Sequence, residues 1–181
     1  MLRLALALSV ILATPVLAQD IPAPRPMDQM RGDCAAFALE VTREAALWAA
    51  GPRTALTASA AASGAPALAT GTLARLALLP QTEMRFAVAP EQDRGGAGRH
   101  AGHLRLEVPQ AGLWRVAASN GLWFDAVAGG AILPSSAFEM QTGCGAPFKV
   151  VVFDLPAGAV TLQFNGSPSP QVEVVALPWA E

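Results

Sequence analysis

Val160-Thr161-Leu162-Gln163-Phe164-Asn165 is the cleanest alternation of apolar and polar residues in the chain. Successive side chains of a β-strand point to opposite faces, so this period of two predicts a strand that buries Val160, Leu162 and Phe164. Similar segments fill most of the second half of the chain. Further strands are predicted at 73–79, 84–88, 103–108, 113–118, 122–127, 150–155 and 172–177.

Two turns of similar sequence separate these strands. Pro109-Gln110-Ala111-Gly112 precedes one strand, and Pro156-Ala157-Gly158 precedes another. Their recurrence between period-two segments predicts a repeated connection at the sheet edge of a mainly β fold, an antiparallel β-sandwich of jelly-roll-like kind. Asn120-Gly121, a strong hairpin signal, predicts a hairpin between 113–118 and 122–127.

The first half of the chain carries one helical pattern. Asp33 is a good N-cap and Gly51-Pro52 a typical stop, so one amphipathic helix is predicted from Cys34 to the residues before Gly51. Residues 53–70 are too weakly patterned to assign, which leaves a second short helix or an irregular connection open. The glycine-rich stretch 89–102 predicts a polar loop.

The predicted helix has an apolar stripe formed by Phe37, Val41 and Trp48. A helix with one apolar stripe packs that stripe against a core, so we expect it to dock on the sandwich. The outward side is expected to carry Glu40, Arg43 and Glu44.

The N-terminal residues have the pattern of a secretory signal peptide. Arg3 is followed by the apolar run 4–13, and Val16-Leu17-Ala18 offers small residues before a cleavage site after Ala18. We therefore expect a protein of the periplasm or the exterior. We expect no lipid anchor, because the residue directly after the cleavage site is not a cysteine. The expected organisation is a signal peptide at 1–18, a proline-rich leader at 19–32, the helix and connection at 33–70, and the sandwich at 71–181, which forms a single domain with the helix.

Charge argues against two classes of partner. Cleavage would remove one base, Arg3, and no acid, which changes the formal net charge from −2 to −3. The remaining basic residues are ten arginines and Lys149, spread without a cluster. This distribution argues against binding to nucleic acid or to an anionic membrane surface, and we expect no membrane anchor after cleavage.

Two cysteines remain, Cys34 and Cys144. In an exported chain, a disulfide between them is the expected state. The alternative is a reactive thiol at a helix start, but the sequence shows no base beside Cys34.

The stretch 102–178, with Phe153-Asp154-Leu155-Pro156-Ala157-Gly158, resembles the β-sandwich domains called pre-peptidase C-terminal domains. The wider layout is similar to a family of small exported bacterial proteins without established function. Three features of this chain carry the similarity. They are the cysteine-initiated helix 34–48, the Gly-Leu-Trp-Phe-Asp strand 121–125, and the segment 144–152, where a cysteine precedes a basic residue and a valine-rich strand. Some members of that family bear the name homogentisate dioxygenase, which implies an iron site.

The residues available for iron are His100, His103 and Glu107. Two histidines and a carboxylate form the facial triad of non-haem iron oxygenases. On a strand, His103 and Glu107 share a face, whereas His100 points away unless the chain bends at Gly102. No further histidine is present for a second cupin motif, so we expect no metal and no cofactor, with these residues forming a polar loop that leads into a strand.

Other catalytic arrangements find little support. Ser135, Ser136 and Ser167 lack the Gly-x-Ser-x-Gly turn of hydrolases. The carboxylates of Asp125, Glu139 and Asp154 remain candidates for an acid/base pair. A structural role is the alternative that we favour for Asp125 and Asp154, with Arg115 or Lys149 as a partner. No residue is therefore expected to be catalytic.

Aromatic residues suggest a binding surface. Trp114, Trp123 and Phe124 fall in the two strands beside Asn120-Gly121, and Trp123 shares a face with Asp125. An exposed pair of this kind, with Trp114 nearby, is typical of carbohydrate and small-ligand platforms. The alternative that we favour is that the N-terminal helix covers Trp123.

These observations predict a non-catalytic exported β-sandwich with an accessory role, either binding an envelope partner or small ligand or contributing to envelope structure. A sugar- or small-molecule-binding module at Trp123 and Asp125 is one alternative, and a metal-dependent oxygenase is another.

Overall fold

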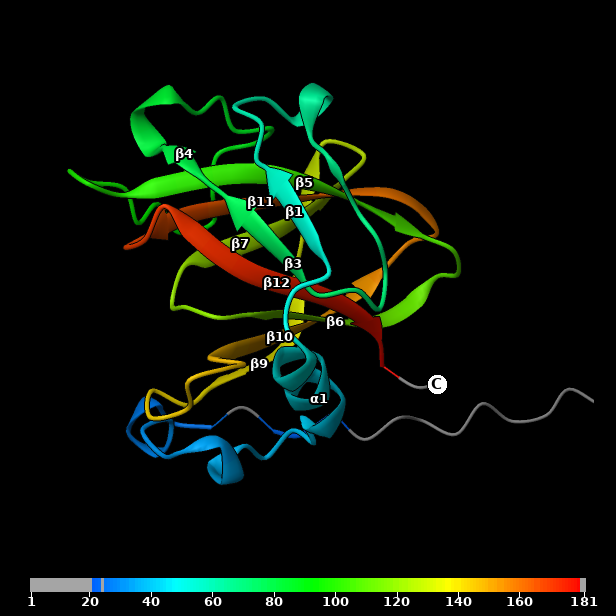
Figure 1. Ribbon diagram of the computed structural model, residues 1–181. Helices are drawn as coiled ribbons and strands as arrows, with labels where there is room; N and C mark the ends of the chain where they lie inside the picture. The colour runs from blue at the N-terminus through cyan, green and yellow to red at the C-terminus, as the bar shows by residue number, and fades with distance from the viewer. Residues whose placement is uncertain (1–20, 24, 180–181) are drawn as a thin grey trace, which may run out of the picture.

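The structure, a computed structural model, describes residues 21–23 and 25–179. Two six-stranded, mostly antiparallel sheets pack face to face as a sandwich (Figure 1). The first sheet has the order β1 (Thr54–Thr57), β3 (Ala74–Ala77), β12 (Gln171–Pro178), β6 (Gly112–Ala118), β10 (Lys149–Leu155) and β9 (Ser135–Met140). The second has β2 (Ala67–Leu68), β5 (His100–Val108), β11 (Gly158–Ser167), β7 (Trp123–Ala128) and β8 (Ala131–Leu133), with β4 (Leu79–Pro80) also on β5. The mainly β sandwich expected from the sequence is confirmed.

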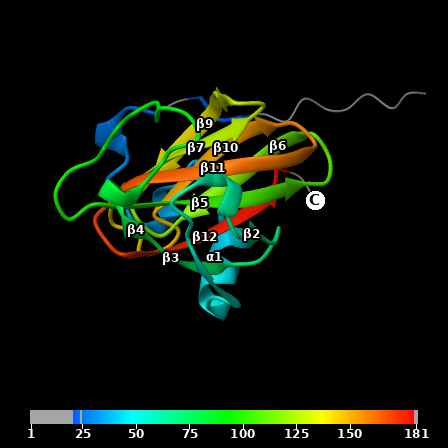
Figure 2. The same cartoon turned by 90° about the horizontal axis from the view of Figure 1, so that it is seen from above.

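The alternating residues of the second half form the core between the two sheets. Leu162 on β11 lies between Leu104 of β5 and Ala126 of β7, and all three side chains are fully buried. Phe164 pairs with Phe124 at the next inward position, with their ring centroids 5.7 Å apart. The period of two therefore identified the inward face of these strands correctly. Figure 2 looks onto the second sheet, with β5 and β11 across its front.

The two recurring turns carry the chain from one sheet to the other. β5 and β6 belong to different sheets, as do β10 and β11. The glycine that ends each turn has a positive φ, 143° at Gly112 and 108° at Gly158, a region that residues with a side chain rarely adopt. Glycine is thus required at both crossings, which explains why the turn sequence recurs.

The predicted hairpin at Asn120-Gly121 is wrong. β6 lies in the first sheet and β7 in the second, so this turn is a third crossing. A hairpin turn of the Asn-Gly type needs a positive φ at both central residues, and neither residue has one. The Asn120 Oδ1 instead accepts a hydrogen bond from the Leu122 amide at 3.0 Å, which makes a local turn that redirects the chain.

The predicted N-terminal helix is confirmed as one short helix, but its predicted start at Cys34 is wrong. A short 3₁₀ turn, Cys34–Ala36, is followed by extended chain at Phe37, and the α-helix α1 covers only Thr42–Ala50. The helix does not begin at Cys34 because of a residue on strand β9. The buried carboxylate of Glu139 on β9 accepts hydrogen bonds from the backbone amides of Ala38 and Leu39, each at 2.9 Å, so these amides do not bond within a helix.

The apolar stripe of this segment packs as expected, on the outer face of the first sheet. Phe37, Val41 and Trp48 contact a second apolar cluster that includes Val150 and Val152 of β10. Figure 1 shows α1 and the N-terminal segment below β9 and β10, on the side away from the second sheet. The helix and the N-terminal segment therefore form a further layer on the outer face of the first sheet.

The expected outward position of Glu44 is wrong. Glu44 is fully buried beneath α1, and its Oε1 lies 2.8 Å from Nη2 of Arg115 on β6. Glu44 lies three residues after Val41 and four before Trp48, so it shares the helix face that carries the apolar stripe.

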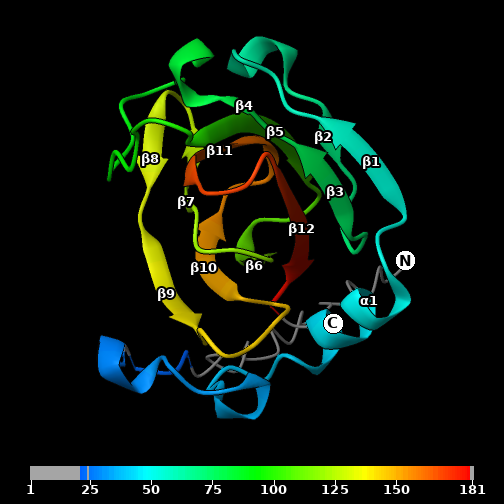
Figure 3. The same cartoon turned by 60° about the vertical axis from the view of Figure 1, so that its left-hand side comes forward.

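The remaining differences concern weakly patterned segments. Residues 53–70 form β1 and β2 with a 3₁₀ turn at Ala62–Gly64. The strand predicted at 84–88 is absent, and this part of the chain has one isolated bridge, from Arg85 to Ala61. β8 and β9 were not predicted; Figure 3 shows them as one ribbon that runs along one side of the sandwich from the second sheet to the first. The other 3₁₀ turns are Met27–Gln29 and Gln81–Glu83.

Within the described residues, no helix has the length and apolar character needed to cross a bilayer. The signal peptide predicted at 1–18 lies outside those residues.

Candidate functional site

The disulfide between Cys34 and Cys144 is confirmed, with the two sulfurs 2.04 Å apart. It joins the N-terminal 3₁₀ turn to the loop between β9 and β10, across 110 positions of sequence. Both sulfurs are bonded to each other, so neither cysteine carries a reactive thiol.

The three metal candidates do not meet. His103 is buried, and its Nδ1 lies 3.1 Å from the Ser59 carbonyl oxygen. Burial lowers the pKa of this imidazole, with the Ser59 contact acting in the opposite direction. Glu107 forms an exposed ion pair with Arg105 at 2.6 Å, whereas His100 lines a separate surface hollow. Across residues 21–23 and 25–179, no three His, Cys, Asp or Glu side chains are grouped to hold a metal ion.

The carboxylates considered as an acid/base pair are also kept apart. Glu139 lies under the N-terminal segment, where Nη1 of Arg25 donates to it at 2.6 Å. Asp154 is exposed on β10, and Asp125 is buried in the second sheet. Each has its own surroundings, so no two of them face one another across a substrate site.

The two tryptophans proposed for ligand binding have different positions. Trp114 is buried between the sheets, and its Nε1 donates to the Gln110 carbonyl oxygen at 3.3 Å, so it is a core residue. Trp123 is half-buried on β7. The expectation that the N-terminal helix covers Trp123 is wrong, because α1 packs on the other sheet.

Asp125 is fixed by hydrogen bonds on the outer face of the second sheet. Its Oδ1 accepts a hydrogen bond from Trp123 Nε1 at 2.7 Å, and its Oδ2 accepts one from Gln163 Nε2 at 2.9 Å. The backbone amide of Glu91 adds a long contact of 3.4 Å to Oδ2. The carboxylate therefore orients the indole of Trp123.

Lys149 completes the site from the opposite sheet. It is the first residue of β10 and shares the inward face with Val151 and Phe153. Only 7% of Lys149 is exposed. Its Nζ lies 4.8 Å from the ring centroid of Trp123, 5.1 Å from that of Phe124 and 5.9 Å from that of Phe138. The ammonium is thus surrounded by aromatic rings at one end of the apolar core.

Hydrogen bonding leaves this amine largely unsatisfied. Among the described residues, the one hydrogen-bond acceptor of Nζ is the Leu122 carbonyl oxygen at 3.5 Å, the outer limit of a hydrogen bond. In the described part of the chain, no carboxylate forms an ion pair with Nζ. Burial, with a smaller contribution from the nearby charge of Arg94, lowers the pKa of Lys149 to about 8, and the charge of Asp125 opposes this shift.

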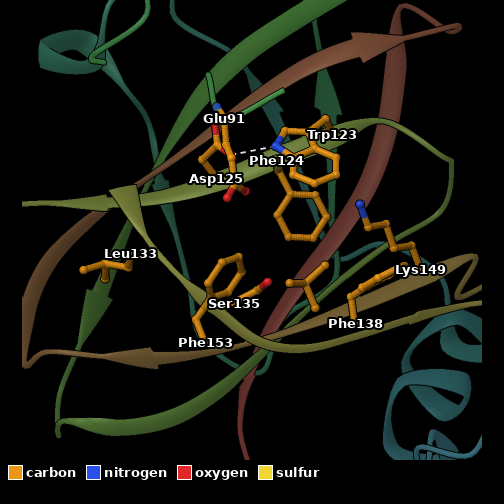
Figure 4. A pocket seen from close by; sticks show the side chains of 10 residues that line it. Glu91, Trp123, Phe124, Asp125, Leu133, Ser135, Phe138, Lys149 and Phe153 are labelled. Atoms are coloured by element: carbon orange, nitrogen blue, oxygen red, sulfur yellow. Dashed lines mark hydrogen bonds between the residues drawn. The ribbon is translucent and has the colours of Figure 1, made fainter. Parts of the chain in front are cut away.

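A cavity of about 30 Å³ opens beside this amine, where β7 and β8 of one sheet meet β9 and β10 of the other (Figure 4). Its walls are mostly apolar, and the amine of Lys149 points toward Trp123 and Phe124. Its lining residues are Glu91, Trp123, Phe124, Asp125, Leu133, Ser135, Phe138, Lys149, Val151 and Phe153. A cavity of this size has room for little more than a water-sized group, so only the end group of a ligand would enter it.

The ring of Trp123 is not an open stacking surface. The guanidinium of Arg94 lies 5.1 Å from its centroid, in addition to the amine of Lys149. A sugar ring would compete with two cations for this indole. The arrangement favours a ligand that enters beside Trp123 over one that stacks on it.

The sequence indicates Lys149 only as a possible partner of a buried aspartate, Asp125 or Asp154. The signal for its position was nonetheless present, because Lys149 has the same strand parity as Val151 and Phe153. The neighbourhood of Arg94 and Phe138 depends on loop and edge-strand positions that the sequence pattern did not predict.

No protein-family model, no curated protein and no solved structure matches this chain.

Proposed function

We propose that this chain is an exported, non-catalytic binding protein of the bacterial envelope, and that its ligand site is the cavity beside Lys149. As part of the same proposal, the chain is similar to exported β-sandwich proteins of the pre-peptidase C-terminal type. The Cys34–Cys144 disulfide is consistent with an oxidising compartment, the periplasm or the exterior.

One observation carries the proposal. Lys149 is only 7% exposed, yet the one acceptor that its amine has among the described residues is at 3.5 Å. A buried polar group without a good partner is unfavourable by roughly 1–3 kcal/mol. A ligand oxygen next to Nζ would relieve that deficit.

The surroundings define the kind of ligand. The aromatic rings of Trp123, Phe124 and Phe138 offer apolar contact, and Phe138 is 38% exposed at the cavity mouth. The carboxylate of Asp125 is already engaged by Trp123 and Gln163. We therefore assign the site to a small, mostly apolar molecule whose one acceptor oxygen enters the cavity, while its apolar part lies outside against Phe138.

Nuclear magnetic resonance of the four indole N–H groups tests the assignment. Cyclohexanol serves as the oxygen-bearing probe, and methyl β-glucopyranoside serves as the carbohydrate probe. The Trp123 signal, assigned from its loss in Trp123→Phe, is expected to shift saturably with cyclohexanol. In Lys149→Met the affinity should fall about fivefold, the value of one hydrogen bond of ~1 kcal/mol.

Arg75→Met is the matched control, because Arg75 is an exposed cation on β3, three strands from β10 in the same sheet. Its affinity for cyclohexanol should equal that of the unaltered protein. No shift at Trp123, or an equal affinity in Lys149→Met, would overturn the assignment. Glucoside binding that is independent of Lys149 would support the carbohydrate alternative in its place.

A further inference from the structure

Lys149 is the only lysine in the chain. The one side-chain amine of this protein is therefore buried in the cavity, and no surface lysine competes with it for an amine-reactive compound. Unlike a guanidinium, an amine can lose its proton and act as a nucleophile.

The neighbours of Lys149 disfavour its protonated form. The nearby guanidinium of Arg94 repels the ammonium, and the apolar walls deprive it of water. Burial and the charge of Arg94 lower the pKa of this amine to about 8, against the opposing charge of Asp125. About a tenth of the amine is then unprotonated near pH 7, against less than about a thousandth for an exposed lysine.

We infer that the Lys149 amine captures a small aldehyde as an imine within this cavity, an inference that rests on the proposed function. A lysine desolvated in an apolar pocket, beside another cation, is the environment in which amines act as nucleophiles toward carbonyl groups. Lys149 has both features, in the burial of its amine and in the proximity of Arg94.

The step needs no co-reactant. The lone pair of Nζ attacks the carbonyl carbon, the π pair of the C=O bond moves to oxygen, and one proton passes from nitrogen to oxygen. The nitrogen lone pair then expels the hydroxyl group, which leaves as water after it takes up a proton. The products are a protonated imine and water, once a solvent proton is counted. The negative charge of Asp125, which already favours the protonated lysine, offsets the charge of this imine.

The size of the cavity selects an aldehyde over a ketone. A volume of about 30 Å³ has room for little more than a water-sized group. A formyl group places only hydrogen beside the carbonyl carbon, whereas a ketone adds a second carbon chain. The rest of the aldehyde would lie outside the cavity, against the exposed part of Phe138.

The test uses butanal and sodium cyanoborohydride, which reduces an imine to a stable secondary amine. Arg75→Lys provides the matched reference, because it adds an exposed amine to the same molecule at a position where the native side chain is half exposed. Intact mass and peptide mapping then give the alkylation rate at Lys149, at the introduced amine and at the N-terminus. Near pH 7 we expect Lys149 to react on the order of a hundredfold faster than the introduced amine, the ratio of their unprotonated fractions.

The pH profile gives a second readout. With enough cyanoborohydride that imine formation limits the rate, alkylation of Lys149 should rise toward pH ~8 and then level off, whereas the introduced amine should continue to gain until pH ~10. The charged groups that face Lys149 are Arg94, Asp125 and Glu91.

The results distinguish failure of the imine at Lys149 from failure of the proposed binding site. Alkylation at Lys149 that is no faster than at the introduced amine overturns the imine. If cyclohexanol still shifts the Trp123 signal in that case, the binding site stands and only the covalent step is wrong. If cyclohexanol gives no shift either, the proposed function falls as well.

Discussion

Nη2 of Arg115 on β6 lies 2.8 Å from Oε1 of Glu44 on α1, and neither side chain is more than 6% exposed. This ion pair fixes the helix to the outer face of the first sheet. Arg115 also donates to the Glu40 carbonyl oxygen and lies against the ring of Trp179. Burial raises the pKa of Glu44 and lowers that of Arg115, each opposed by the charge of the other, so desolvation is the larger effect on both.

Replacement of one partner should therefore cost much more than replacement of both. Glu44→Ala leaves a buried guanidinium without its carboxylate and is expected to lower the free energy of unfolding by about 3–5 kcal/mol. The pair Glu44→Leu with Arg115→Met fills the same space with apolar side chains and should come within about 1 kcal/mol of the unaltered protein. Urea unfolding of the three proteins checks this. A double variant as unstable as Glu44→Ala would contradict it.

Loss of the disulfide should destabilise the fold without changing it. Replacement of Cys34 and Cys144 by alanine frees a loop of 110 positions, for which chain entropy predicts a loss of about 4–5 kcal/mol. Chemical denaturation of the double variant measures this loss. The circular dichroism of its native state should match that of the unaltered protein, because the sandwich core does not involve either sulfur. A loss below about 1 kcal/mol would mean that the bridge adds little to the tether that Glu139 already supplies.

Glu139 is expected to hold the N-terminal segment against β9. Its carboxylate accepts hydrogen bonds from Ala38, Leu39, Arg25 and Gln141. Glu139→Gln keeps the shape but loses the charge, and it should cost about 2–3 kcal/mol, the range for hydrogen bonds to a charged group. Limited proteolysis should then cleave the segment before α1 faster than in Asp154→Asn, the control on the neighbouring strand. Equal cleavage rates would argue against this role.

The strands were predictable because their evidence is local. A period of two places Val160, Leu162 and Phe164 on one face whatever the rest of the chain does. The same pattern says nothing about which sheet a strand joins. The Asn120-Gly121 hairpin failed for that reason, since both flanking strands were recognised and only their partners were wrong.

The helix and the site depended on contacts between distant segments. The carboxylate of Glu139 binds the amides of Ala38 and Leu39 from a strand one hundred positions away, and no local propensity predicts that break. The environment of Lys149 likewise combines three elements: its own strand, Trp123 on the other sheet and Arg94 on a loop. Sequence alternation predicts the direction of Lys149 but not these neighbours.

Lys149 also predicts how stability depends on alkaline pH. Its pKa falls from an ordinary 10.5 to about 8 in the folded protein, chiefly because of burial. Between these two values the unfolded chain binds more protons than the folded one, so the free energy of unfolding rises with pH. The rise should total about 3 kcal/mol, from a shift of roughly 2.5 pH units at 1.36 kcal/mol each.

Few other groups obscure this signal. The chain has no tyrosine, both cysteines are bonded, and no second lysine exists, so the N-terminal amine is the one other group that ordinarily titrates near this range. Lys149→Met should abolish the rise and increase stability near pH 7, because a methionine fills the same space without a charge to bury. Urea midpoints between pH ~7 and ~10.5 measure both effects. A slope that persists unchanged in Lys149→Met would show that this amine is as well solvated in the folded protein as in the unfolded chain, and the case for a buried nucleophile would lose its physical basis.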